Sequence, residues 1–192
     1  MNTKVAHTGI VRPRFTCRQI LILFCIFILI MAWVSPGHAA DRFKPFKLKT
    51  IDGTTRTLDD YKGRAILVAF FFPTCTYCNK ALPETLKIYN RYRDQGLAMV
   101  WINIVREEEK QIPDWLAQHH YENIPVLVGA SHRKLQRQYK IEMTPEHLII
   151  NQDREILFRQ RGYHAGKEIE LEAQVKQALG LTGQPLAANY SP

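Results

Sequence analysis

The chain has 192 residues, of which 46% are hydrophobic, and a formal net charge of +8. The charge does not indicate nucleic-acid binding, because four basic residues precede the first acidic one, Asp41, and residues 41–192 carry only +4. The other basic residues are interspersed with acidic ones and form no stripe with aromatic residues, which excludes a nucleic-acid partner. The composition is that of a globular protein with one domain and short extensions.

A charge-free run of 15 apolar residues, 20–34, follows the basic N-terminal stretch and precedes small residues that include Ala39. This order is typical of a secretory signal peptide, and we expect cleavage after Ala39. The alternative is an N-terminal membrane anchor formed by residues 20–34, although 15 residues are short for a span of about 20. Residues 1–40 thus predict export, with a periplasmic or other extracytoplasmic location for the rest of the chain.

The exported part is predicted as one domain over residues 41–182, followed by a flexible tail at 183–192. A turn at Asp52-Gly53 predicts a hairpin over residues 46–58. Eight consecutive apolar residues, 65–72, predict a strand buried on both faces, as in the centre of a parallel sheet.

Residues 75–93 have helical spacing, with Pro83 expected to kink the helix. The remaining elements are predicted as a strand at 97–105, a helix at 107–120, a strand at 126–128, a helix at 131–139, strands at 148–150 and 156–158, and a helix at 165–179. This alternation predicts an α/β fold with a mixed central sheet flanked by helices.

Four cysteines occur, and Cys17 and Cys25 lie within the predicted export segment. The domain therefore retains one pair, Cys75 and Cys78, which lie on the first turn of the predicted helix after the central strand. Unsatisfied N–H groups at a helix N-terminus stabilise a thiolate. The spacing lets Cys75, nearer the tip, attack a substrate and Cys78 resolve the mixed disulfide, so we expect a redox-active Cys75–Cys78 disulfide. A zinc site usually needs a second ligand pair, and we predict no metal or other cofactor.

The sequence also resembles a known family. The run from Asp52-Gly53 through Lys62-Gly63-Arg64 and the apolar strand to Cys75-Thr76-Tyr77-Cys78 resembles the redoxin/TlpA-like (ResA-like) branch of the thioredoxin superfamily. Thr144-Pro145, followed by an apolar strand, is similar to the cis-proline segment of that family. The resemblance covers residues 43–180. It implies a thioredoxin-like fold with an N-terminal hairpin extension and the activity of a thiol–disulfide oxidoreductase.

The resemblance also implies roles for individual residues. Pro145 would be cis and face the two sulfurs, and Thr144 would offer its backbone to an extended substrate. Glu107 matches an acidic residue near the dithiol, where a carboxylate raises thiol pKa values and relays protons; the alternative is an ordinary helix-start acid. Tyr77 is expected at the helix tip, either in substrate recognition or as a simple exposed aromatic. His147, close to the proline, is a further candidate.

Several positions differ from thioredoxin itself. Ala69 occupies the place of a buried aspartate, Thr74 replaces the usual tryptophan before the first cysteine, and Thr76-Tyr77 replaces Gly-Pro. Because the residues between the cysteines tune the reduction potential, the sequence leaves open whether the protein reduces or oxidises its partners.

We expect an exported reductase of specific disulfide-containing or dithiol proteins. A membrane electron donor is expected as a second partner, because glutathione and thioredoxin are cytosolic. One alternative is a thiol peroxidase, but its motif has a threonine three residues before the reactive cysteine, where this chain has Phe72. Another is a Sco-like copper chaperone, which uses a CxxxC spacing.

Overall fold

The computed structural model describes residues 41–121, 124–129 and 132–182. The signal peptide or anchor predicted at 1–40 and the tail predicted at 183–192 lie outside these residues. Among the helices of the described ranges, none combines the length and apolar character needed to cross a membrane.

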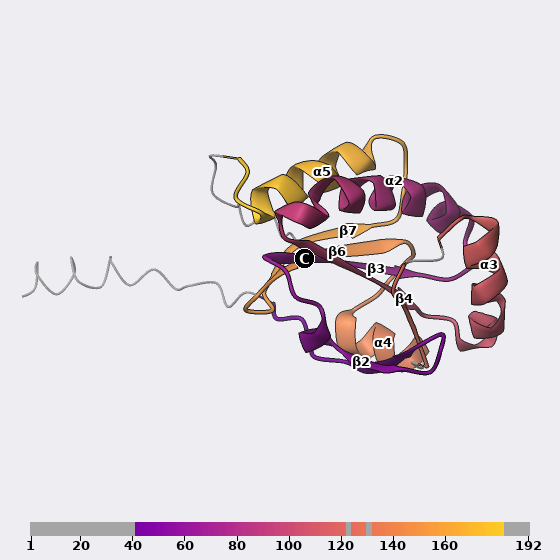
Figure 1. Ribbon diagram of the computed structural model, residues 1–192. Helices are drawn as coiled ribbons and strands as arrows, with labels where there is room; N and C mark the ends of the chain where they lie inside the picture. The colour runs from indigo at the N-terminus through magenta and orange to yellow at the C-terminus, as the bar shows by residue number, and fades with distance from the viewer. Residues whose placement is uncertain (1–40, 122–123, 130–131, 183–192) are drawn as a thin grey trace, which may run out of the picture. The chain divides into compact units, whose positions relative to one another are not determined.

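A mixed sheet, seven-stranded in the described residues, forms the centre of the fold (Figure 1). Its spatial order is β2-β1-β5-β4-β3-β6-β7. β3 pairs in parallel with β4 and antiparallel with β6, which confirms the predicted mixed sheet. The strands are β1 (Lys47–Thr50), β2 (Thr55–Thr57), β3 (Ala65–Phe71), β4 (Leu97–Asn103), β5 (Val126–Val128), β6 (Glu146–Asn151) and β7 (Ile156–Arg161).

The N-terminal hairpin is confirmed as β1 and β2, which pair antiparallel, and β1 joins the sheet through β5. At its turn, Gly53 adopts a positive φ of 85°. The Asp52 carboxylate accepts hydrogen bonds from the Thr50 hydroxyl and the Thr54 N–H. These bonds, the one from Thr50 first, lower the pKa of Asp52 to about 2. The Asp52 side chain thus stabilises the turn that the Asp52-Gly53 pair predicted.

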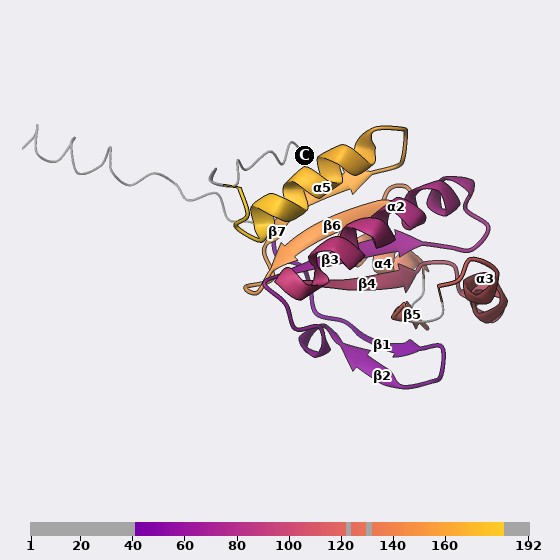
Figure 2. The same cartoon turned by 45° about the horizontal axis from the view of Figure 1, so that its top comes forward.

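Helices lie on both sides of the sheet, with α2 and α5 on one face and α4 on the other (Figures 1 and 2). The α-helices are α2 (Thr76–Tyr92), α3 (Ile112–Gln118), α4 (His132–Tyr139) and α5 (Lys167–Ala178), and short 3-10 helices are η1 (Leu58–Asp60), η2 (Arg93–Gln95) and η3 (Arg106–Gln111). α2 continues through Pro83 without a break.

The helix predicted at 107–120 is wrong in its first half, where the chain forms η3 instead of an α-helix. Pro113 favours the division, although Pro83 shows that an interior proline does not by itself end a helix. Proline has no N–H to donate within a continuous α-helix, whereas the first turn of a helix tolerates it. The α-helical part therefore begins only at Ile112, with Pro113 in its first turn.

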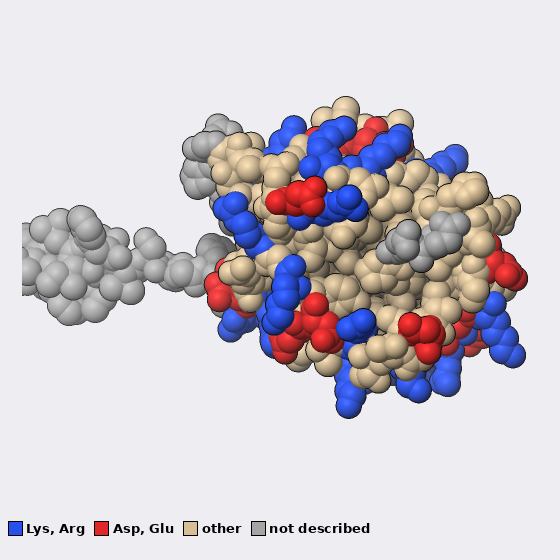
Figure 3. Space-filling view, in the orientation of Figure 1, with Lys and Arg blue, Asp and Glu red and all other residues tan. Residues whose placement is uncertain are grey.

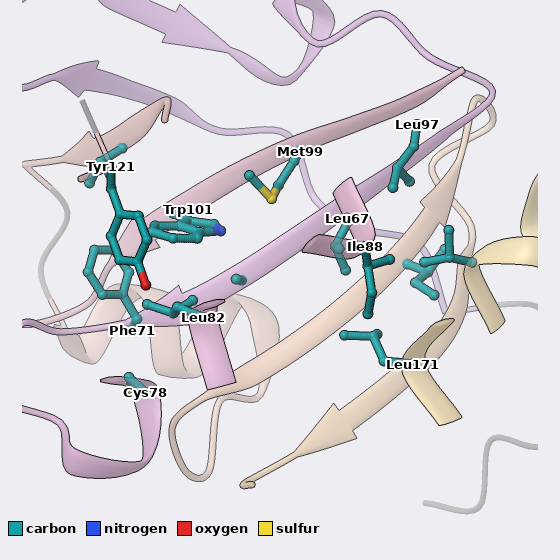
Figure 4. Packing of buried hydrophobic residues seen from close by; sticks show 14 of the residues in the cluster. Leu67, Phe71, Cys78, Leu82, Ile88, Leu97, Met99, Trp101, Tyr121 and Leu171 are labelled. Carbon is teal, nitrogen blue, oxygen red and sulfur yellow. The ribbon is translucent and has the colours of Figure 1, made fainter. Parts of the chain in front are cut away.

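β3 is buried at every position, as the apolar run predicted, and it separates two core layers. One set of its side chains, including Leu67 and Phe71, packs with residues of α2 and α5 (Figure 4) and also with residues of α3. The alternate set, including Phe70, packs with Phe43 and Tyr139 on the α4 side. Burying one such side chain contributes about 1.5–3 kcal/mol. The strand is thus fixed from both faces, and its carboxyl end is a rigid support for the residues that follow.

Candidate active site

The two cysteines lie where β3 leads into α2. Cys75 is the N-cap of α2, and its Sγ accepts a hydrogen bond from the Cys78 N–H at 3.1 Å. The two residues form a disulfide with their Cα atoms 5.1 Å apart, which confirms the predicted pair. Cys75 is 6% exposed, whereas Cys78 is fully buried beside Leu82 and Phe71 (Figure 4). Of the two sulfurs, that of Cys75 is therefore the more accessible to a partner.

The Thr144–Pro145 peptide bond is cis, as the resemblance implied. The Thr144 hydroxyl lies 3.6 Å from the Cys75 Sγ, so residues 69 positions apart in the chain meet at the disulfide. The Pro145 carbonyl accepts a hydrogen bond from the Gly162 N–H at 2.8 Å. The geometry thus brings Thr144 and Cys75 together, while the substrate-binding roles of Thr144 and Pro145 stay predictions.

The acidic side chain that contacts the active-site loop is Glu108. Its Oε2 accepts a hydrogen bond from the Thr74 N–H at 3.0 Å, and its Oε1 accepts one from the Thr74 hydroxyl at 2.8 Å. Glu109 instead accepts a hydrogen bond from the Gly129 N–H. Glu107 is exposed, and among the described residues no hydrogen bond joins it to the active-site loop. The catalytic role predicted for Glu107 stays a prediction, and sequence reasoning missed the contact that its neighbour makes.

Asn79 holds the same loop from inside the fold. Its side-chain amide donates to the Pro73 carbonyl at 3.1 Å, and its oxygen accepts from the Trp115 indole N–H at 3.0 Å. The Trp115 ring packs against Phe71, with ring centroids 5.2 Å apart. One side chain thus connects the active-site loop, α2 and α3, although nothing in its sequence context marked it.

Two large apolar side chains are exposed beside the site. Tyr77, on the first turn of α2, is 58% exposed, and Met143, directly before Thr144, is 51% exposed. The Lys80 ammonium lies 6.0 Å from the Tyr77 ring centroid. The Met143 sulfur lies against Gly162, where an added Cβ would stand only 3.0 Å from it. The predicted exposure of Tyr77 is confirmed, whereas Met143 was not recognised from the sequence.

A buried carboxylate follows the cis-proline directly. Glu146 is fully buried and forms ion pairs with Arg159, itself 3% exposed, and with Arg161. The Glu146 Oε2 also accepts a hydrogen bond from the Glu142 N–H at 3.4 Å. A buried charge of this kind is tolerated only with partners. These contacts fix the segment that carries Pro145, and the sequence analysis did not identify them.

His147, which the sequence suggested as a candidate site residue near the cis-proline, is buried in the core. It stands opposite Ala69 across the β3–β6 pairing, and its Nε2 lies 2.9 Å from the Thr85 hydroxyl. Thr85 is seven residues beyond Cys78, which is about 10 Å along the axis of α2. Burial lowers the pKa of His147 to about 4, so the ring is neutral near pH 7. In the described part of the chain, no group of three His, Cys, Asp or Glu side chains is placed to hold a metal ion.

A disulfide at the start of the helix after the central strand, with a cis-proline segment against its outer sulfur, is the arrangement of thioredoxin-like thiol–disulfide oxidoreductases, and the protein is of this class. The chain belongs to the AhpC/TSA family, whose model matches residues 39–159. The predicted redoxin membership and the thioredoxin-like fold are both confirmed.

The sequence identity to individual relatives is low. The chain is 28% identical over 127 residues to the thioredoxin-like protein YneN of Bacillus subtilis, covering 65% of this chain and 72% of that protein. It is 22% identical over 123 residues to the thiol-disulfide oxidoreductase ResA of Halalkalibacterium halodurans, covering 64% and 68%. A solved thiol:disulfide interchange protein DsbE from Chlorobium tepidum superposes with a TM-score of 0.66 at 22% identity, covering 73% of this chain and 97% of that one. The structural likeness bears on the fold alone.

Proposed function

We propose that the protein is an exported reductase that passes electrons from the Cys75–Cys78 dithiol to disulfides of specific extracytoplasmic proteins. The observation that carries the proposal is the position of Cys75 at the N-terminus of α2, with the Thr144 hydroxyl 3.6 Å from its sulfur. The sulfur of the less buried cysteine, beside a fixed backbone segment, is suited to exchange with a protein substrate.

The exchange takes place in two substitutions at sulfur. The Cys75 thiolate attacks one sulfur of the partner's disulfide, forms a mixed disulfide and releases the partner's first thiolate. The Cys78 thiolate then attacks the Cys75 sulfur, which forms the intramolecular disulfide and releases the second thiolate. Two electrons and, after protonation of both thiolates, two protons pass to the partner. The enzyme ends in the disulfide form that the structure holds.

The local backbone favours Cys75 as the attacking sulfur. The Cys78 N–H already points at the Cys75 Sγ at 3.1 Å, and α2 begins at Thr76. An N–H donor and the positive end of a helix both stabilise a thiolate relative to a thiol. Cys78 lies one turn deeper and fully buried, which suits a sulfur that meets only the mixed disulfide.

Substrate recognition is assigned to the surface around this sulfur. Thr144 and Pro145 would align an extended partner segment, because the chain before a cis-proline keeps backbone groups available for pairing. The exposed Tyr77, two residues after Cys75, and Met143, directly before Thr144, offer apolar area near the site. A partner that presents an apolar residue near its cysteine would gain contact here that a polar peptide would not.

Export and the electron supply complete the proposal. The charge-free segment 20–34 after a basic stretch supports export. The dithiol is the only cysteine pair in residues 41–192, so each reduction of a partner exhausts it. Because cytosolic reductants are excluded outside the cytoplasm, a membrane dithiol donor would re-reduce it. The donor would supply the two electrons that the partner consumes.

A redox titration of the purified protein tests the direction of electron flow. A reductase should have a potential near about −270 mV, whereas a value near about −120 mV would identify an oxidant and overturn the proposal. Cys75→Ser should abolish reduction of insulin disulfides. Cys78→Ser should instead accumulate mixed disulfides through Cys75; trapping through the other sulfur would refute the assigned order of attack.

A further inference from the structure

Although basic and acidic residues are interspersed along most of the chain, the exposed side of α4 is basic. Residues 123–141 contain four lysines and arginines and no aspartate or glutamate. Leu135 and Tyr139, four positions apart, are buried in the core, so the opposite side of the helix faces solvent. Arg133 and Arg137, also four positions apart, are both exposed on that side. The folding of α4 onto the sheet therefore gathers charges of one sign on a single face.

This basic face is hollowed. A hollow of about 510 Å³ is lined by Lys44, Arg133, Lys134, Arg137 and Gln138. Within the part of the chain that the structure describes, no carboxylate forms a salt bridge with Lys44, Arg133 or Arg137. Asp41, the acidic residue at the start of the domain, pairs instead with Lys140 at 3.5 Å. These three cations can therefore bind anionic groups from outside the chain.

The polypeptide enters the domain beside the same face. The Tyr139 hydroxyl donates a hydrogen bond to the Lys44 carbonyl at 3.0 Å, and the Gln138 side-chain amide donates one to the Pro45 carbonyl at 3.1 Å. The Phe43 ring stacks on the Tyr139 ring, with centroids 4.5 Å apart. The first residues of the domain are thus fixed along α4.

The sequence before the domain limits how far this face can lie from a membrane. Only six residues separate the charge-free segment 20–34 from Asp41. A connection of this length spans at most about 25 Å when fully extended. An apolar segment after a basic stretch enters the bilayer as a signal peptide or as an anchor. While it is there, Asp41 and the neighbouring face of α4 would be held close to the lipid headgroups.

Contact through α4 would leave the redox site accessible. α4 and α2 lie on opposite faces of the sheet (Figures 1 and 2). Arg42 pairs with Glu155 in the turn between β6 and β7, and this turn lies at the amino end of β3, where Ala65 pairs with Asn151. Cys75 follows the carboxyl end of β3. The chain entry and the reactive sulfur therefore lie at opposite ends of the central strand.

We propose that the basic face of α4, formed by Lys44, Arg133, Lys134 and Arg137, binds the anionic headgroups of a lipid bilayer and holds the domain with Cys75 directed away from the membrane. Guanidinium groups match the geometry of phosphate oxygens, and basic side chains at an anionic bilayer are attracted to its surface charge. The short connection to segment 20–34 favours a membrane over an acidic protein as the occupant. The inference goes beyond the proposed function and shares with it only the export of the chain.

The test is co-sedimentation of the full chain with two kinds of vesicle, one of phosphatidylcholine alone and one of phosphatidylcholine mixed with phosphatidylglycerol. The neutral vesicles measure binding through the apolar segment, so the readout is the ratio of the two partition coefficients. We expect a ratio well above one that falls as salt is raised, because salt screens exposed charges. Arg133→Gln/Arg137→Gln should lower the ratio about 10- to 30-fold, since each basic residue near an anionic surface contributes about fivefold.

A matched variant separates the face from the net charge. Lys87→Gln/Arg93→Gln removes the same total charge from exposed positions on α2 and η2, and it should leave the ratio nearly unchanged. An equal fall in this variant would overturn the proposal, as would a wild-type ratio of one. Preference for soluble polyglutamate over the anionic vesicles would assign the face to an acidic protein and also overturn it. Circular dichroism checks that each variant is folded.

The outcome is separable from that of the proposed function. Vesicle binding needs neither the dithiol nor a protein substrate. A ratio of one together with a reducing potential would reject the membrane face and keep the reductase. A ratio that depends on Arg133 and Arg137, together with an oxidising potential, would keep the membrane face and reject the reductase.

Discussion

The buried histidine makes the stability of this fold depend on pH in a defined window. His147 is fully buried, and burial lowers its pKa from 6.5 to about 4. The unfolded chain therefore binds a proton between these pH values that the folded chain does not. The free energy of unfolding must fall as pH is lowered from 6.5 towards 4. The expected loss is about 2 kcal/mol between pH 7.5 and 5, and about 3 kcal/mol once both states are protonated.

The contacts of the ring explain why it stays neutral. The Thr85 hydroxyl lies 3.0 Å from the Ala81 carbonyl and 2.9 Å from the His147 Nε2. If the hydroxyl donates to the carbonyl, its oxygen accepts from an Nε2–H, and Nδ1 carries the lone pair. That nitrogen is buried and has no hydrogen-bond partner among the residues that the structure describes. Protonation would place an unpaired donor and a positive charge there, both costly in the core.

The assay is urea unfolding of the oxidised protein at several pH values from 5 to 7.5, compared with His147→Leu. In His147→Leu, the free energy of unfolding should no longer fall between pH 7.5 and 5, whether or not its value at pH 7.5 differs from that of the wild type. His164→Gln, which removes an exposed histidine, should keep the fall. Two carboxylates with lowered pKa values do not affect the measurement between pH 5 and 7.5. Glu172 accepts a hydrogen bond from Tyr92 and Asp60 accepts one from Thr57, and their contributions to the free energy of unfolding are lost only at lower pH. A wild-type slope retained in His147→Leu would refute the reasoning.

Three further outcomes follow from contacts around the site. Asn79→Ala should cost about 1–3 kcal/mol of unfolding free energy in urea titrations, because it leaves the Trp115 N–H without its partner. Glu146→Gln should cost about 3–5 kcal/mol of unfolding free energy, because it removes the carboxylate that forms an ion pair with the buried Arg159. Replacing both residues by apolar ones should cost less, and equal losses would argue against the ion pair. Tyr77→Ala should raise the KM for a protein substrate, since the side chain is 58% exposed; an unchanged KM would remove Tyr77 from substrate recognition.

The sequence revealed those features whose signal is local. The strand at β3 follows from a long apolar run, and the disulfide follows from the spacing of Cys75 and Cys78 after it. The local sequence could not predict which of the three adjacent glutamates contacts the active-site loop, because η3 turns successive side chains in different directions. Only Glu108 reaches the loop.

The buried ion pair was beyond sequence reasoning for a different reason. Charged residues are expected on the surface unless a partner is known. The partner of Glu146 lies on β7, and the pairing of β6 with β7 shifts register between Ile149 and Ile150. Glu146 faces Arg161, whereas its buried partner Arg159 faces Leu148, so the ion pair could not be inferred from a simple pairing of the two strands. Figure 3 agrees with the broader inference from charge, since basic and acidic side chains are interspersed on the face shown.

The hairpin of β1 and β2 has a consequence for how molecules of this protein meet one another. Without it, β5 would be an edge strand with the apolar sequence Val126-Leu127-Val128 open to pairing with another chain. With it, the sheet ends at β2, a strand of three residues with Arg56 at its centre. Short, charged edges resist the strand addition through which sheets aggregate. The extension thus serves colloidal stability, because it limits strand addition between molecules of this protein.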